Sequence, residues 1–199
     1  MPSGREMNIL GIDYSLNGTG LALYDGKDII MKKVFTTTKK DEDNNPENFI
    51  FVPKTKDTMG KIDTVAGIIV EHAKQADYVL MEDHIGRYYN WMDGYGIIKH
   101  LLRKEGIPYI MASPTMIKKY AGNGKADKNM MSFFLKNDYG FDFDYLGKLA
   151  NNIVDASWMA IMGYKYHKIH IEKAKEYDTP ARTKILKTLA DKEKKQRGE

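Results

Sequence analysis

Three acidic residues that lie far apart in the chain, Asp13, Glu82 and Asp155, each occur where a strand or a helix could deliver a carboxylate to one shared point. Asp13 and Glu82 each end a short apolar run, and Asp155 lies inside a strongly periodic helical stretch. Carboxylate oxygens suit Mg²⁺, which keeps several waters and leaves positions open for phosphate oxygens. Two such ions about 4 Å apart can activate a water and stabilise the leaving oxygen of a phosphodiester. The three acids therefore indicate a metal site.

Each acid also has a structural interpretation. An Asp after a strand is often a turn residue, and Asp155 could occupy an ordinary solvated helical position. Glu82 is harder to explain in this way, because a buried carboxylate needs a cation or hydrogen bonds to compensate it. Asn151 and Asn152 share a helical face with Asp155, so their amide oxygens could also coordinate a cation or position water. A solvated polar face would show the same pattern.

The elements that must position these acids begin with three strands. We expect the strands at 7–13, 19–24 and 29–35, with turns at Asn17-Gly18 and Asp25-Gly26, which predicts antiparallel pairing. Residues 36–58 break the pattern and predict a surface insertion, which a small hairpin could tip.

The rest of the chain alternates helices and strands. Ser113-Pro114 predicts a helix N-cap followed by Pro in the first turn. We expect a helix from 59, a strand at 78–82, a helix at 90–104, a strand at 108–112, and two helices at 125–137 and 145–164. This order predicts an α/β fold with a mixed central sheet flanked by helices.

Length and composition fit one globular domain with an appendage. The chain has 199 residues, of which 42% are hydrophobic and 29% charged. The absence of cysteine excludes disulfides and thiolate metal sites and fits a reducing compartment. Without a long apolar run or a signal-peptide core, we expect no membrane association and a cytoplasmic location.

The positive charge is concentrated at the C-terminal end. Residues 165–199 carry 11 Lys/Arg and 6 Asp/Glu, so this segment holds the whole basic excess of a chain with net charge +4. Such a tail, helical or flexible, could attract nucleic acid phosphates through counterion release. A solvated, partly frayed helix would have the same composition.

Four blocks of the sequence, in order, resemble the RuvC family of Holliday junction resolvases. The resemblance covers roughly residues 7–164, and its divergence looks more like a phage member than a cellular one. Any block alone would be weak, and the ordered set carries the resemblance. The blocks are Gly-Ile-Asp-Tyr-Ser-Leu-Asn-Gly-Thr-Gly-Leu-Ala at 11–22, Val-Leu-Met-Glu at 79–82, the basic segment at 113–128, and Asn-Ile-Val-Asp-Ala at 152–156.

This resemblance implies an RNase H-like fold over residues 1–164, a homodimer, and Mg²⁺-dependent nicking of two opposed strands of a four-way DNA junction. Mn²⁺ is expected to substitute for Mg²⁺. Asp13, Glu82 and Asp155 match the family's first, second and last catalytic carboxylates, which would hold the metals. The family usually has a further Asp where this chain has Asn152. An amide oxygen can still ligate a hard cation, so Asn152 is included among the expected ligands.

The stretch from Lys118 to Lys128 resembles the family's basic segment near the scissile phosphate. Lys118 and Lys128 are the better matches, with Lys119 as a competing assignment for Lys118. Lys119 and Lys125 are expected to contact the DNA backbone as point charges. A glycine-rich turn before a solvated helix is the alternative interpretation.

An aromatic cluster follows Glu82. In Arg87-Tyr88-Tyr89-Asn90-Trp91, one cation and three aromatic rings could form a platform for unstacked DNA bases. Such a cluster could equally belong to the core or to a dimer contact.

Two other functions compete with the nuclease. Residues 11–20 also resemble the phosphate-binding turn of actin-like kinases, which would make the chain an ATP-binding protein, but its length leaves no room for two such domains. A catalytically silent nucleic-acid-binding protein of the same fold is favoured only by Asn152. The three acids instead favour a metal-dependent, structure-selective DNA endonuclease that uses water as the nucleophile.

Overall fold

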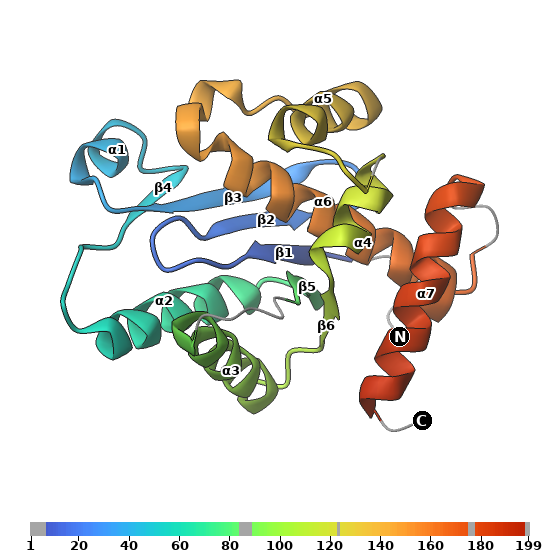
Figure 1. Cartoon of the computed structure of the whole chain (residues 1–199), viewed down its shortest axis with the longest axis horizontal. Coiled ribbons are helices and arrows are strands. Elements are labelled where there is room, and N and C mark those ends of the chain that lie inside the picture. Colours follow the sequence, from blue (N-terminus) through green and yellow to red (C-terminus); the bar gives the residue numbers. More distant parts are fainter. Residues whose placement is uncertain (1–6, 84–88, 123, 175–177, 198–199) are drawn as a thin grey trace.

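The computed structural model describes residues 7–83, 89–122, 124–174 and 178–197, with backbone only for 89–92 and 196–197. Within these residues six strands form one sheet in the order β4-β3-β2-β1-β5-β6 (Figure 1). The strands are β1 (Ile9–Asp13), β2 (Gly20–Tyr24), β3 (Ile29–Thr36), β4 (Phe49–Phe51), β5 (Tyr78–Glu82) and β6 (Tyr109–Ala112).

The first three strands pair antiparallel, which confirms the prediction from their turns. The remaining pairs are parallel, so the sheet is mixed. The prediction that a small hairpin could form the tip of 36–58 is wrong. That segment forms a short helix, α1 (Lys39–Asn44), and then β4, which adds to the sheet edge parallel to β3. Phe49 and Val52 are buried, so this segment also contributes to the core.

In the described parts of the chain, six longer helices complete the fold. They are α2 (Thr58–Ala73), α3 (Tyr89–Lys104), α4 (Pro114–Ala121), α5 (Lys128–Tyr139), α6 (Ala150–Tyr166) and α7 (Pro180–Arg197). A 3₁₀ turn precedes α6 and a π-helical turn, His167–Ile171, follows it. Ser113 caps α4 ahead of Pro114, as predicted. Helix α5 begins three residues later than expected because the Asp127 carboxylate accepts the Met130 N–H and caps it there.

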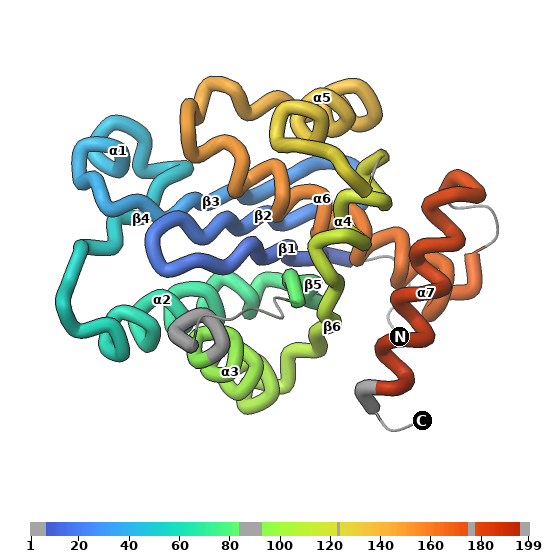
Figure 2. Tube along the Cα trace, in the orientation of Figure 1, coloured from blue at the N-terminus to red at the C-terminus, as the bar shows by residue number. Residues whose placement is uncertain are grey.

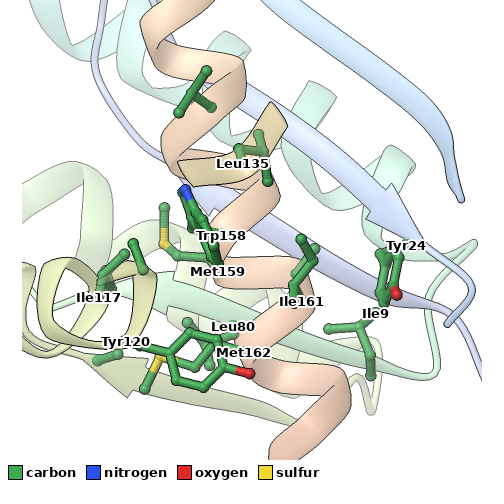
Figure 3. Close-up of a cluster of buried hydrophobic side chains, with 14 of the residues drawn as sticks. Ile9, Tyr24, Leu80, Ile117, Tyr120, Leu135, Trp158, Met159, Ile161 and Met162 are labelled. Carbon is green, nitrogen blue, oxygen red and sulfur yellow. The ribbon is translucent and has the colours of Figure 1, made fainter. Parts of the chain in front are cut away.

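Side-chain alternation divides the core between the two faces of the sheet. Along β1, Ile9 belongs to the buried cluster that includes residues of α4, α5 and α6, while Leu10 and Ile12 belong to the cluster that includes residues of α2 and α3. Helix α6 lies across the first of these faces, and Figure 3 shows its Trp158 and Met159 among side chains of the strands and of α4 and α5. None of the helices in the described parts of the chain is long and apolar enough to cross a bilayer.

Helix α6 approaches the sheet unusually closely over β1 and β2. A Cβ atom built on Gly11 would lie 1.9 Å from the Ala156 carbonyl oxygen, and one built on Gly20 would lie 2.1 Å from the Asn152 carbonyl oxygen. Only residues without a side chain allow the two backbones to come this close. The glycines of the first sequence block therefore serve the packing of α6.

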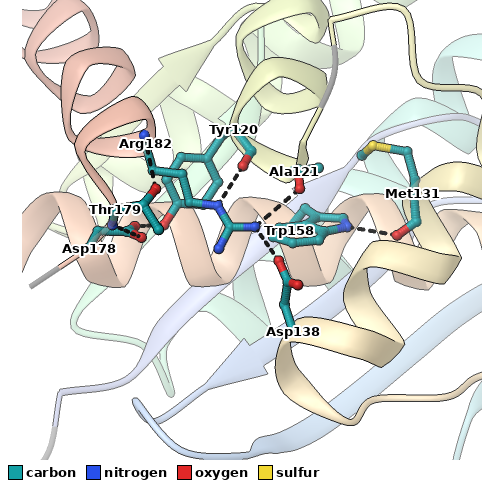
Figure 4. A network of polar contacts seen from close by, with 8 residues as sticks. All are labelled: Tyr120, Ala121, Met131, Asp138, Trp158, Asp178, Thr179 and Arg182. Atoms are coloured by element: carbon teal, nitrogen blue, oxygen red, sulfur yellow. Dashed lines mark hydrogen bonds and ion pairs between the residues drawn. The ribbon is translucent and has the colours of Figure 1, made fainter.

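Helix α7 packs on the body of the protein, beside α4, α6 and β6 (Figure 2). Leu186 and Leu189 are fully buried. Arg182 fixes the start of the helix, since its guanidinium donates to the carbonyls of Tyr120 and Ala121 and pairs with Asp138 (Figure 4). This part of the basic segment is thus an ordered helix rather than a solvated tail.

We expect Arg182→Ala to destabilise the protein by about 3 kcal/mol, because two backbone carbonyls and one carboxylate would lose a charged donor. The guanidinium also lies 5.3 Å from the Tyr120 ring centroid and 5.2 Å from that of Trp158. Urea unfolding measures the loss. Arg103→Ala is the control, because exposed Arg103 lies over one ring, that of Tyr109. Equal, small losses in both variants would show that Arg182 does not anchor α7.

Candidate active site

Asp13 and Glu82 end two neighbouring parallel strands on the same side of the sheet. The register pairs Ile12 with Met81, so Asp13 and Glu82 are the next pair along. Neighbouring strands are about 4.8 Å apart, which places the two side chains side by side. Because Ile9 of β1 and Leu80 of β5 face α6, alternation turns both carboxylates toward that helix.

Helix α6 brings the third carboxylate to the same place. Its Ala156 lies directly over Gly11, two residues before Asp13, which sets the neighbouring Asp155 beside the ends of β1 and β5. Asn152 is one turn earlier, and its side-chain nitrogen is 2.7 Å from the position a Cβ would take on Gly18. Asn152 therefore lies against the turn that joins β1 to β2.

The three carboxylates interact electrostatically, which shows that they share one site. Burial and the charges of Asp155 and Glu82 raise the pKa of Asp13 well above its usual range. Burial, together with the charge of Asp155, raises the pKa of Glu82 to about 7. Burial also raises the pKa of Asp155 to about 6, against the opposing effect of Lys128 and Lys118. Ionising all three groups is therefore unfavourable without added positive charge.

Within the described residues no side chain pairs directly with these carboxylates, although the charges of Lys118 and Lys128 favour their ionised forms. Across the described residues, no hydrogen bond or ion pair engages the carboxylate of Asp13, Glu82 or Asp155. As placed, no three acidic or histidine side chains in those residues converge closely enough to hold one metal ion. A cavity of about 40 Å³ does open between Glu82, Asp155 and Lys118. In type and charge the acids and the Asn152 amide suit a hard divalent cation, which would have to draw the carboxylates together.

The structure distinguishes between the predicted lysines. Lys118, on α4, lowers the pKa of both Glu82 and Asp155, and Lys128, at the start of α5, lowers that of Asp13 and Asp155. Lys119 points elsewhere, because its side chain packs on Gly124 and lines a separate depression beside Phe134. Lys125 is exposed in the turn before α5. Lys118 and Lys128 are thus brought to the carboxylates and Lys119 is not.

The aromatic cluster lies outside the described residues. This applies to Arg87 and Tyr88 entirely and to the side chain of Tyr89, although its backbone begins α3. Their role in binding bases stays a prediction.

Sequence reasoning missed three groups around the site. Buried Lys61 of α2 donates to the Asn17 side chain 2.7 Å away and so holds the turn that follows Asp13. Lys192 of α7 pairs with Asp83, the residue after Glu82. A lysine on a helix usually indicates a solvated position, and the partners of these two lysines are distant in sequence, so no local pattern could have revealed either contact.

The third group is the Tyr14 ring, which follows Asp13 and belongs to the buried cluster on the other face of the sheet, with residues of α2 and α3. Tyr14 is buried, and its ring packs edge-on against Tyr95 with 5.0 Å between centroids. The charges of Glu82 and Asp13 add to burial in raising the pKa of Tyr95. This tyrosine pair connects α3 to the end of β1, and Tyr14 was predicted only as part of the first sequence block.

Comparison with solved structures identifies the fold. No protein-family model and no curated protein matches the sequence. The RuvC protein of Thermus thermophilus, solved in complex with a Holliday junction substrate, superposes with a TM-score of 0.58 over 82% of this chain and 97% of its own, at 14% identity. The yeast mitochondrial Holliday junction resolvase Ydc2 gives 0.51 over 94% and 87%, at 15% identity.

These similarities define the class of the protein at the level of its architecture. The chain has the RNase H-like fold of RuvC-like Holliday junction resolvases, as the ordered sequence blocks predicted. Sequence identity is low throughout.

Proposed function

We propose that this chain is a metal-dependent, structure-selective endonuclease that nicks opposed strands of four-way or otherwise branched DNA junctions. One observation carries the proposal. Three carboxylates that are not hydrogen-bonded within the described residues lie on one face of the sheet, at the ends of β1 and β5 and in the first half of α6, and the charges of two lysines act on them. Burying such a cluster is costly unless cations bind it. The fold, which is that of junction resolvases, agrees with this assignment.

In this proposal Asp13, Glu82 and Asp155 hold Mg²⁺, or Mn²⁺ in its place, and Asn152 offers an amide oxygen. When bound, the ions would supply an activated water and charge stabilisation at the scissile phosphodiester. The chain itself orients the carboxylates through the rigid ends of two strands and one helix. Lys118 and Lys128 would place positive charge beside the phosphate as its negative charge grows.

The remaining assignments concern DNA and assembly. Lys119 and Lys125 would contact the DNA backbone away from the scissile phosphate, and Arg87, Tyr88 and Tyr89 would stack on bases opened at the crossover. A homodimer would present two such sites to the two opposed strands. Residues 1–164 form the nuclease domain in this assignment, 36–58 an insertion and 165–199 a basic appendage. The enzyme would act in the cytoplasm, that of the host if it is encoded by a phage.

Cleavage of an immobile four-way junction tests the function directly. Each arm is labelled in turn, and a linear duplex of the same sequence serves as the control substrate. Paired, symmetric nicks in the junction that need Mg²⁺ or Mn²⁺ are expected, and sedimentation of the complex should show two chains. Junction binding without cleavage in either metal would instead identify a catalytically silent binding protein. If the chain neither binds nor cleaves the junction, the ATP-binding alternative would be favoured.

Two adjacent lysines provide a sharper test of the site. We expect Lys118→Met to slow junction cleavage by about 10- to 100-fold, because its charge lies beside Glu82 and Asp155. Lys119→Met removes the same charge one residue later, but the Lys119 side chain packs on Gly124. The single-turnover cleavage rate of this variant on bound junction should therefore change less than about threefold. A larger loss of rate in Lys119→Met than in Lys118→Met would contradict the arrangement.

A further inference from the structure

A second group of charged side chains lies at the other end of α6, away from the carboxylates. There the helix passes into the π-helical turn His167–Ile171, and the turn and α7 enclose an open cavity of about 400 Å³. From Asp155 to His170 is 15 residues, or about 22 Å of helix at 1.5 Å per residue. This cavity is therefore separate from the candidate active site.

His170 is the central residue of the cavity. Its Nε2 atom is buried and has no hydrogen-bond partner among the described residues. A buried polar atom normally has a partner, and π-helical turns frequently mark functional sites. Lys173 follows in a left-handed conformation, with φ of 60°, and its ammonium donates to the His170 carbonyl 2.6 Å away. An unusual backbone therefore holds His170, a lining residue whose buried imidazole nitrogen is unpaired, at the edge of the cavity.

Three lysines are among the nine residues that line the cavity, against two acids. Lys173 comes from the turn, and Lys187 and Lys194 come from α7, two turns apart on one face. Of the two acids at the cavity, Glu193 is occupied, because it accepts hydrogen bonds from the hydroxyls of Tyr78 and Tyr166.

Asp191 is the other acid among the lining residues, and its charge acts on His170. Burial lowers the pKa of His170, and Lys173, Lys187 and Lys194 lower it further against the opposing charge of Asp191. Among the described residues, the positive potential at the imidazole is thus opposed by Asp191 alone, against three lysines.

We propose that this cavity is a binding site for a phosphate group, with His170, Lys173, Lys187 and Lys194 as its donors. A phosphate oxygen would accept from the unpaired His170 nitrogen once the imidazole turned this buried atom toward the cavity, and the lysines would balance the phosphate charge. Since the proposed enzyme acts on DNA, we assign the phosphate to the backbone of a junction arm. This last step rests on the proposed function, and the cavity would then hold the arm far from the cut.

Inorganic phosphate tests the cavity without any need for DNA. The protein is labelled with ¹³C and ¹⁵N at histidine, and the His170 ring signals are assigned with His170→Gln. Phosphate should shift these signals saturably and raise the pKa of His170, because bound negative charge favours the imidazolium. Lys194→Ala should weaken binding about tenfold, whereas Lys195→Ala, which removes the next charge on α7 but does not line the cavity, should leave it unchanged. Chloride at equal ionic strength is the salt control, and an equal response to both salts would overturn the site.

Junction binding tests the assignment to DNA. Affinity is measured without divalent cations over a range of salt concentrations, so that cleavage plays no part. Lys194→Ala should reduce the slope of log affinity against log salt by about 1 and Lys195→Ala by much less. Equal slopes in the two variants would overturn the DNA assignment and, with phosphate binding intact, leave a site for free phosphate. Wild-type junction cleavage, measured separately, reports on the proposed function alone.

Discussion

Asp13→Asn should reduce Mg²⁺-dependent junction cleavage by at least about a thousandfold and, in the same protein, raise the stability of the metal-free fold. The expected loss of cleavage follows from the proposed role of Asp13 as a metal ligand beside Glu82 and Asp155, since such charge stabilisation contributes several kcal/mol and about 4 kcal/mol equals a thousandfold in rate. The gain in stability follows because the neutral amide avoids burying a charged carboxylate and also removes its repulsion with Asp155 and Glu82.

The pH dependence of this gain has a definite sign. Glu82 has a pKa of about 7 in the folded protein, above the ordinary value of 4.5, and Asp13 is raised in the same sense. A carboxyl whose pKa is raised by folding contributes its full stabilisation below the unfolded pKa and loses it as pH rises through the folded pKa. Metal-free wild type should therefore lose stability at the site between about pH 4.5 and 7, on the order of 2 kcal/mol. Asp13→Asn should lose less.

Thermal unfolding in EDTA at pH 5 and pH 8 measures this difference. The melting temperature of Asp13→Asn should exceed that of wild type by about 4–8 °C at pH 8 and by much less at pH 5. Asp63→Asn, a change at an exposed position of α2, should give no such difference at either pH. Mg²⁺ should then stabilise wild type more than Asp13→Asn. An Asp13→Asn protein that melts below wild type in EDTA at pH 8 would show that the ionised Asp13 carboxylate does not destabilise the metal-free fold.

The local signals in the sequence were sufficient for the part of the fold that carries the site. Two-residue alternation in β1 and β5 specifies which side chains share a face, and the turn residues specify the antiparallel start. The apolar stripe of α6 left Asn152 and Asp155 on the face that meets the strand ends. The roles of Asp13, Glu82 and Asp155 as metal ligands stay predictions until a metal titration or a cleavage assay tests them.

Contacts between distant segments could not be predicted in the same way. The pairing of β4 with β3 depends on three residues without a turn that specifies their partner. The ion pair between Lys192 and Asp83 joins residues 109 positions apart. Arg182 reaches the end of α4 from a segment whose composition fitted either a tail that attracts nucleic acid phosphates or a solvated helix. Each of these contacts depends on how finished helices pack, which no local periodicity encodes.

Of the substitutions that add one methyl group to the sheet, Gly11→Ala should lower the stability of the protein most. The added Cβ would lie 1.9 Å from the Ala156 carbonyl oxygen and 2.6 Å from the Ala160 nitrogen, both backbone atoms of α6. Neither atom can move away as a flexible side chain would, so the whole helix must shift from β1. Helix α6 carries the buried Trp158, and overpacking of this kind costs about 3 kcal/mol or more.

The matched control adds the same methyl group where there is room for it. At Gly67, in α2, nothing lies within 4 Å of the added Cβ, so Gly67→Ala should stabilise the protein by about 0.5–1 kcal/mol through helix propensity. Urea unfolding of both variants, with wild type, measures the two free energies of unfolding. A Gly11→Ala protein as stable as Gly67→Ala would mean that α6 does not lie on β1 at this distance.

The same substitution connects packing to chemistry, because the contact at Gly11 also sets the position of Asp155. A shift of α6 by about 1 Å would move this carboxylate away from Asp13 and Glu82, and misplacement on that scale can cost about a hundredfold in rate. Junction cleavage by Gly11→Ala is measured well below its melting temperature, where circular dichroism shows the folded state. Slow cleavage by a folded Gly11→Ala protein, beside normal cleavage by Gly67→Ala, would show that the glycine in β1 positions the third carboxylate. Normal cleavage by both would mean that Asp155 is positioned independently of this contact.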